Sequence, residues 1–167
     1  MIRILQESTQ DLEEIHSINS KAFDSDIEAN LVDKLRGVTK PYISLVAKEH
    51  GIVLGHVLFT PVFVGDFNIN AMGLGPMAVT PERQGEGIGS SLTNEGLKAC
   101  RTIDVNVVFV LGEPDYYARF GFEIISEKGL YYKGEEFSPY FLAIELTPNC
   151  LKGISGEVHY HKFFDDV

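Results

Sequence analysis

A glycine-rich turn between an apolar strand and a helix constrains this chain more than any other feature. Residues 81–89 read Pro-Glu-Arg-Gln-Gly-Glu-Gly-Ile-Gly, follow the apolar segment 72–80, and lead into a helical pattern that continues to about Ala99. After the helix, residues 105–111 are almost uniformly apolar, which is typical of a strand covered on both faces in a parallel pairing. Strand, turn, helix and strand therefore predict one βαβ unit.

The helix start at this turn predicts a binding site for an anion. The first backbone N–H groups of a helix have no intrahelical acceptor, and Gly85, Gly87 and Gly89 would let a phosphate approach them. A nucleotide-binding P-loop does not fit, because its lysine is missing. A dinucleotide-binding turn fits poorly, because residues 81–84 separate the first glycine from the strand and Ser90 occupies the third glycine position.

The segments before the turn predict a first strand, two helices and a hairpin. Residues 2–6 have a short strand pattern, and apolar residues then recur at helical spacing in 12–23 and 27–35. Two segments rich in β-branched and aromatic residues, 42–48 and 52–64, flank a Glu-His-Gly turn. This arrangement predicts a β-hairpin.

The strand before the turn and the segments after it predict a mixed sheet. Gly75 and Pro76 interrupt that strand, which indicates a bulge or the close approach of another backbone. Further strands are expected at 122–125 and 140–145, and a polar loop is expected at 128–138. The pattern predicts an α/β (α+β) fold with a mixed, largely antiparallel sheet, one splayed parallel strand pair, and helices on both faces.

Size and charge narrow the class of protein. The chain has 167 residues, enough for one hydrophobic core, so we expect a single domain at 1–167 with 146–167 as a C-terminal extension. The 24 acidic and 14 basic residues give a net charge of −10, the wrong sign for a nucleic acid or an anionic membrane as partner. With no signal peptide and no apolar run long enough to span a membrane, a cytoplasmic location is expected.

The cysteines and histidines favour neither a disulfide framework nor a metal site. Cys100 and Cys150 have no repeated spacing, and we expect both to be reduced thiols. His159 and His161 would share one face of a strand, but no third ligand accompanies them. We therefore expect no metal.

Two motifs, in this order, resemble those of the GNAT superfamily of acyl-CoA-dependent N-acyltransferases. Residues 84–89 match the pattern Gln/Arg-x-x-Gly-x-Gly/Ala, and residues 116–122 match an aromatic-Tyr-x-x-x-Gly-Phe pattern. The likeness covers roughly residues 1–145 and is closest to an uncharacterised bacterial subgroup of predicted acetyltransferases. The resemblance implies an N-acetyltransferase domain with acetyl-CoA as co-substrate.

The resemblance also implies which residues bind the cofactor. The backbone at Met77 and Val79 would hydrogen-bond the pantetheine arm like an added strand, and N–H groups from Gln84 onward would hold the pyrophosphate. The expected cofactor-binding residues are Met77, Ala78, Val79, Gln84, Gly85, Glu86, Gly87, Ile88, Gly89 and Ser90.

Tyr117 is the expected catalytic residue. In the family that the chain resembles, the tyrosine four residues before the Gly-Phe pair donates a proton to the leaving thiolate, and a phenol with a pKa near 10 is protonated at neutral pH. Val110 stands where the family often has an asparagine, and residues 71–79 contain no glutamate base. We assign no general base among the residues that could supply one, which are Asp24, Asp26, Glu28, His56 and Glu113.

The expected reaction is N-acetylation of a primary amine by direct attack in a ternary complex. One alternative is a non-catalytic acyl-CoA-binding or sensor domain, and a second is a nicotinamide or flavin dinucleotide binder. We expect the acceptor to be a small-molecule or peptide amine, and the acidic net charge favours a cationic one. The oligomeric state, including a homodimer, is left open.

Overall fold

The computed structural model describes all 167 residues, which form two compact units. The first unit comprises residues 1–60, 75–99 and 162–167, and the second comprises 61–74 and 100–161. None of the helices has both the length and the apolar character that crossing a membrane would require.

The strands of the first unit confirm the predicted hairpin. Strand β1 (Arg3–Gln6) pairs antiparallel with β2 (Ile43–Glu49), and β2 pairs antiparallel with the first part of β3 (Ile52–Val64). His50 and Gly51 form the hairpin turn with φ of 53° and 77°, as a two-residue turn with the twist of the flanking strands requires.

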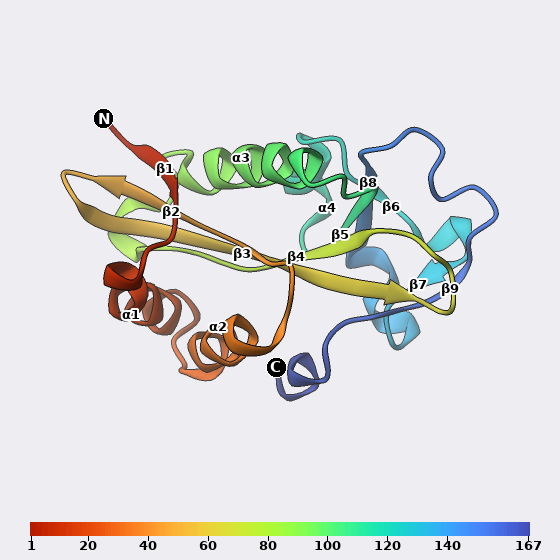
Figure 1. Cartoon of the computed structure of the whole chain (residues 1–167), viewed down its shortest axis with the longest axis horizontal. Coiled ribbons are helices and arrows are strands. Elements are labelled where there is room, and N and C mark those ends of the chain that lie inside the picture. The colour runs from red at the N-terminus through yellow and green to blue at the C-terminus, as the bar shows by residue number, and fades with distance from the viewer. The chain divides into compact units, whose positions relative to one another are not determined.

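Two helices pack on one face of these strands. Helices α1 (Leu12–Phe23) and α2 (Ile27–Val38) lie where the helical spacing predicts them, and Asp24 between them has a left-handed backbone with φ of 52°. Their buried residues share a core with strands of the first unit: Ile15, Ile18, Leu31, Val32, Leu35, Val46, Val53, Leu58 and Ala78. Figure 1 shows α1 and α2 on one side of β2 and β3, with helix α3 on the other side.

Helix α3 (Ile88–Thr102) packs closely on β3 through glycine. A Cβ atom on Gly96 would lie under 3.0 Å from the ring of Phe59, so the helix approaches the strand at a distance that only glycine permits. The helix ends three residues beyond the expected Ala99, because the buried Cys100 continues its apolar face.

The second unit contains the predicted parallel pair. Strand β4 (Ala71–Val79) pairs parallel with β5 (Val107–Leu111) over residues 71–74. Antiparallel pairing then joins β5 to β8 (Phe141–Glu145) and β8 to β6 (Glu123–Ile124). The predicted fold class, a largely antiparallel mixed sheet with a parallel β4–β5 pair, is confirmed.

The expectation of a loop at 128–138 is wrong in part. Leu130–Tyr131 form strand β7, which pairs parallel with β9 (Gly156–His159), and a 3-10 helix begins at Glu135. Leu130 is fully buried in the core of this unit, where the rings of Phe109 and Phe141 stack at 5.4 Å. A two-residue strand has no periodicity that a sequence pattern can reveal, which explains the difference.

Candidate active site

The glycine turn adopts a backbone that only glycine accepts without strain. Gly85 and Gly87 have φ of 83° and 85°, and a Cβ on either residue would meet nothing within 4 Å. Glycine is therefore needed here for conformation and not for space. The turn is exposed and leads directly into α3 at Ile88, so the first N–H groups of a 15-residue helix lie at this end of the turn.

Side chains hold the turn to the neighbouring strands. Arg83 donates from Nε to both carboxylate oxygens of Glu86, at 2.9 and 3.0 Å, and from Nη1 to Glu49 at 3.0 Å. The Gln84 amide donates to the carbonyl oxygen of Val79 at 3.1 Å. Glu86 would repel a phosphate at this turn, and its pairing with Arg83 offsets that charge.

The expected backbone sites for the cofactor arm lie at the end of β4. Met77 and Val79 are half-buried, whereas Ala78 is buried in the core of the first unit. The hydroxyl of Thr93 on α3 lies 3.5 Å from the Met77 sulfur. The pairing of β4 with β5 extends to Leu74, and Gly75 follows with φ of 139°, which places the predicted interruption of the strand here.

Tyr117 lies in the second unit, on the short helix α4 (Pro114–Ala118). Its ring packs on Gly112, where a Cβ would be 3.0 Å from Cδ2, and makes edge contacts with Tyr116 and Phe122 at centroid distances of 4.9 and 5.5 Å. The side chain is buried, and burial together with Tyr116 raises the pKa of Tyr117 above the usual range of a phenol. The group is therefore a neutral O–H donor at neutral pH.

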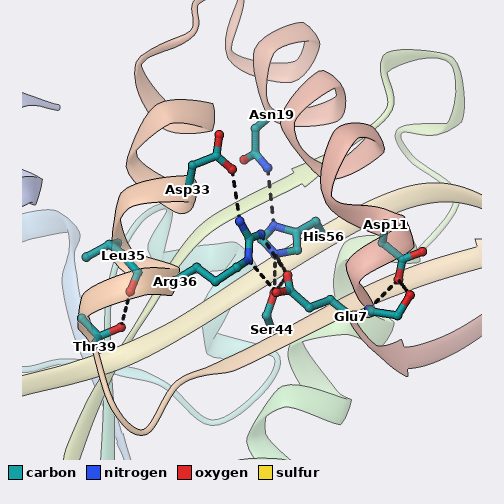
Figure 2. Close-up of polar contacts among 10 residues, drawn as sticks. Glu7, Asp11, Asn19, Asp33, Leu35, Arg36, Thr39, Ser44 and His56 are labelled. Carbon is teal, nitrogen blue, oxygen red and sulfur yellow. Dashed lines mark hydrogen bonds and ion pairs between the residues drawn. The ribbon is translucent and has the colours of Figure 1, made fainter.

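His56, one of the residues considered as a base, lies in a buried polar network of the first unit. Its Nε2 is 2.8 Å from the Ser44 hydroxyl, and its Nδ1 is 3.4 Å from the Asn19 amide nitrogen (Figure 2). Burial lowers the pKa of His56 to about 4 from 6.5. His56 is thus neutral at pH 7, fully buried, and a weak base.

Hydrogen bonds fix the direction of this network. An N–H of the Asn19 side-chain amide donates to the Ile15 carbonyl oxygen at 3.0 Å, which identifies this atom as the amide nitrogen. The same nitrogen faces His56 Nδ1, so Asn19 is the donor there and Nδ1 is the acceptor. His56 Nε2–H then donates to Ser44, whose hydroxyl donates to Glu7. Sequence reasoning did not find this network, because Glu7, Ser44 and His56 come from three separate strand regions with no motif spacing.

An arginine completes the network at its outer end. Arg36 of α2 donates from Nε and Nη2 to the two carboxylate oxygens of Glu7, at 2.6 and 3.0 Å, and from Nη1 to Asp33 at 3.1 Å (Figure 2). The paired carboxylates raise the pKa of Arg36, although burial opposes that effect. The Asn19 Oδ1 atom is buried without a hydrogen-bond partner. The hydrogen bonds and ion pairs of the other groups join the two helices to the hairpin and stabilise their packing.

The other carboxylates considered as bases lie at the surface. Asp24, Asp26 and Glu113 are exposed, and Glu28 is half-buried in the first turn of α2. Asp26 accepts a hydrogen bond from Ser20 at 2.7 Å. Glu113 directly precedes α4 as its N-cap residue.

A hollow of about 380 Å³ lies in the first unit beside the start of the glycine turn. It carries two acidic and two basic side chains, so it is a polar surface without a dominant charge. Its lining residues are Glu14, Ser17, Ile18, Lys21, Ile52, Val53, Leu54, Thr80, Glu82 and Arg83.

A turn of this conformation, at the end of a strand that pairs in parallel and at the start of a helix, suits a phosphate-bearing cofactor. The family model described as an acetyltransferase (GNAT) domain matches residues 2–125. The chain belongs to the GNAT acetyltransferase family, and the prediction of an acyltransferase enzyme is confirmed at that level.

Relatives from two bacteria support the family assignment. The chain is 34% identical over 152 residues to YhbS, an uncharacterised N-acetyltransferase of Escherichia coli K12, and the match covers 90% of this chain and 91% of YhbS. The structure of E. coli YhbS in complex with CoA has a TM-score of 0.92 and 33% identity, covering 98% of this chain and 92% of that one. A GNAT family acetyltransferase of Brucella melitensis in complex with acetyl-CoA has a TM-score of 0.83 and 36% identity, covering 99% of both chains.

Proposed function

We propose that the chain transfers an acetyl group from acetyl-CoA to a primary amine by direct attack in a ternary complex. The observation that carries the proposal is the exposed turn at the start of α3, in which Gly85 and Gly87 both have a left-handed backbone. The relatives crystallised with CoA and acetyl-CoA support this cofactor.

The cofactor would bind through backbone groups. N–H groups from Gln84 to Ser90 hold the pyrophosphate, and backbone groups of β4 at Met77, Ala78 and Val79 hold the pantetheine arm. Backbone donors at a helix start bind phosphate locally, so a net charge of −10 does not oppose an anionic cofactor. Arg83 supports the turn through Glu49 and Glu86.

Tyr117 would act as the general acid. The amine nitrogen attacks the thioester carbonyl carbon, the C–S bond breaks, and the thiolate takes the proton of the Tyr117 hydroxyl. The nitrogen then releases its extra proton to solvent, and the phenolate is protonated again. The raised pKa of Tyr117 keeps the proton available before the C–S bond breaks.

His56 does not serve as the base in this proposal. Its two ring nitrogens contact Ser44 and Asn19, and its side chain is fully buried. A lysine-like amine with a pKa near 10.4 must lose a proton before it attacks, which costs about 4 to 5 kcal/mol at pH 7. Because solvent removes this proton from the amine, the rate of acetyl transfer should rise with pH.

Calorimetry with acetyl-CoA, followed by thiol release across a panel of amines, tests the proposal. We expect saturable binding of acetyl-CoA and thiol release with at least one amine. Binding without turnover on any amine would favour the sensor domain. Saturable NAD binding without CoA binding would favour the dinucleotide binder and contradict the proposal.

A further inference from the structure

The side chains of the glycine turn add no positive charge to the expected phosphate site. From Gln84 to Ser90 the only charged residue is Glu86, an acid. The Gln84 side-chain amide already donates to the carbonyl oxygen of Val79 at 3.1 Å. Attraction for a phosphate therefore comes mainly from the backbone N–H groups at the start of α3, and their number does not increase with the charge of the ligand.

Arg83 offsets the charge of Glu86 only in part, because a second carboxylate shares this arginine. The Nε of Arg83 donates to both oxygens of Glu86 at 2.9 and 3.0 Å, and its Nη1 donates to Glu49 at 3.0 Å. One guanidinium between two carboxylates leaves these three side chains with a net charge of −1. The N-terminal amine lies 4.0 Å from Glu49, but its exposed fraction is 91%, so water screens its charge.

Glu86 lies in the middle of the expected phosphate site. It stands between Gly85 and Gly87, whose left-handed backbone shapes the turn, and 44% of its side chain is exposed. Its carboxylate cannot lie far from the N–H groups of its own turn, so it repels a phosphate held there. This repulsion grows with each charge on the ligand, whereas the attraction reaches a limit once every backbone donor is used.

We propose that Glu86 makes the turn selective for the pyrophosphate diester of coenzyme A over nucleoside di- and triphosphates. Each phosphate of the diester carries one charge, whereas the chain of phosphates in a free nucleotide carries more. A group that repels the wrong ligand can provide specificity even where it weakens binding of the right one. This inference rests on the proposed function and adds a specificity-determining residue to it.

Calorimetric binding of dephospho-CoA, ADP and ATP to the full chain, without magnesium at pH 8, tests this inference. All three ligands contain adenosine and a chain of phosphates, with about two, three and four negative charges respectively. A unit charge about 6 Å away in water changes binding about threefold for each charge on the ligand. Glu86→Gln should therefore raise the affinity for ATP at least about threefold more than the affinity for dephospho-CoA, with ADP between them, and Glu86→Lys should raise it about tenfold more.

Glu95→Gln is the matched control. Glu95 lies about two turns into α3 and pairs with Lys98 three residues later, as Glu86 pairs with a base three residues earlier. The exposed fractions of the two glutamates are 45% and 44%. Glu95→Gln should leave the ratio of the two affinities unchanged. The gain in Glu86→Gln should also shrink as ionic strength rises, which a change in the shape of the turn would not produce.

Two results would overturn the inference alone. One is ATP binding that is no tighter in Glu86→Lys than in the wild type, and the other is an equal gain for ATP and dephospho-CoA in that variant. Because the expected effect is a gain in affinity, a variant that merely fails to fold cannot imitate it. Failure of the wild type to bind both CoA and dephospho-CoA would instead overturn the proposed function, and this inference with it.

Discussion

At the scale of single residues, glycine serves two different purposes in this chain. Gly85 and Gly87 have open space around them but a left-handed backbone, whereas Gly73 and Gly96 lie against aromatic rings that a Cβ would displace. The first kind shapes the turn, and the second kind lets rings reach the backbone. A substitution at Gly85 or Gly87 should therefore strain the backbone of the turn, whereas a substitution at Gly73 or Gly96 should displace an aromatic ring.

Gly87→Ala should weaken acetyl-CoA binding about tenfold, because the new side chain makes the left-handed backbone unfavourable by about 1–2 kcal/mol. Calorimetry measures the effect. Gly153→Ala is the matched control, since Gly153 also has a left-handed φ, of 79°, with nothing within 4 Å. Equal acetyl-CoA affinity in the two variants would contradict a role of the turn in binding.

Tyr117→Phe should reduce turnover on an accepted amine by about 10²-fold or more, with little change in acetyl-CoA affinity, since only the proton donor is lost. Tyr116→Phe, at the neighbouring ring, is the control. In the wild type the raised pKa of Tyr117 keeps the phenol protonated from about pH 6 to about pH 9, so kcat/KM should rise with pH as the amine deprotonates. Full turnover of Tyr117→Phe throughout that range would show that another group supplies the proton.

At the scale of elements, long or strongly patterned segments were predictable and short ones were not. The hairpin β2–β3 and the parallel pair β4–β5 lie where their apolar patterns predict them. Strand β7 was missed, because two residues form a strand only when β9 is present to pair with them. The contact between α3 and β3 was missed for a similar reason, since it depends on Gly96 meeting Phe59 across the fold.

Gly96→Ala should destabilise the protein by about 1–3 kcal/mol, although alanine is the better helix former, because its Cβ would collide with the Phe59 ring. Gly37→Ala in α2 is the matched control, since nothing lies within 4 Å of its Cβ position, and it should leave stability equal or raise it by up to about 1 kcal/mol. Denaturant unfolding compares the two. Similar stability of both variants would show that α3 can shift without cost.

Because His56 is buried in this network, the free energy of unfolding should depend on pH. The pKa of His56 is lowered to about 4 in the folded protein from 6.5, so the unfolded chain binds more protons between these values. Stability should therefore fall as pH falls from about 6.5 toward about 4, with a contribution of up to about 3 kcal/mol from His56. Above about pH 6.5 this contribution is constant.

His56→Gln should flatten the pH dependence of the unfolding free energy in this window, relative to the wild type. His159→Gln, at an exposed histidine, should not. Glu7, Asp33 and Arg36, the charged groups that act on His56, are present in both proteins, so the comparison isolates the effect of the histidine. Parallel curves for the wild type and His56→Gln would contradict the buried, neutral state of His56.

At the scale of the whole molecule, the net charge of −10 bears on the acceptor. A local site made of backbone donors accounts for an anionic cofactor, so the excess of acidic groups remains available to attract a cationic amine. We expect the KM for a cationic acceptor to rise with ionic strength, while the KM for a neutral acceptor stays constant. Steady-state kinetics at several salt concentrations measures both KM values. A salt-independent KM for the cationic amine would contradict a role of the net charge in attracting the acceptor.

The sequence by itself determined the family, the order of the main elements and the expected position of the cofactor turn. These features depend on neighbours in the chain: glycines that permit a left-handed backbone, a helix that starts after them, and apolar periodicity. The tertiary structure alone decided that Tyr160 lies on Gly73 and that Glu7, Ser44 and His56 join in one buried network. Those contacts join residues far apart in the chain, and side-chain packing that brings distant segments together leaves no local pattern in the sequence.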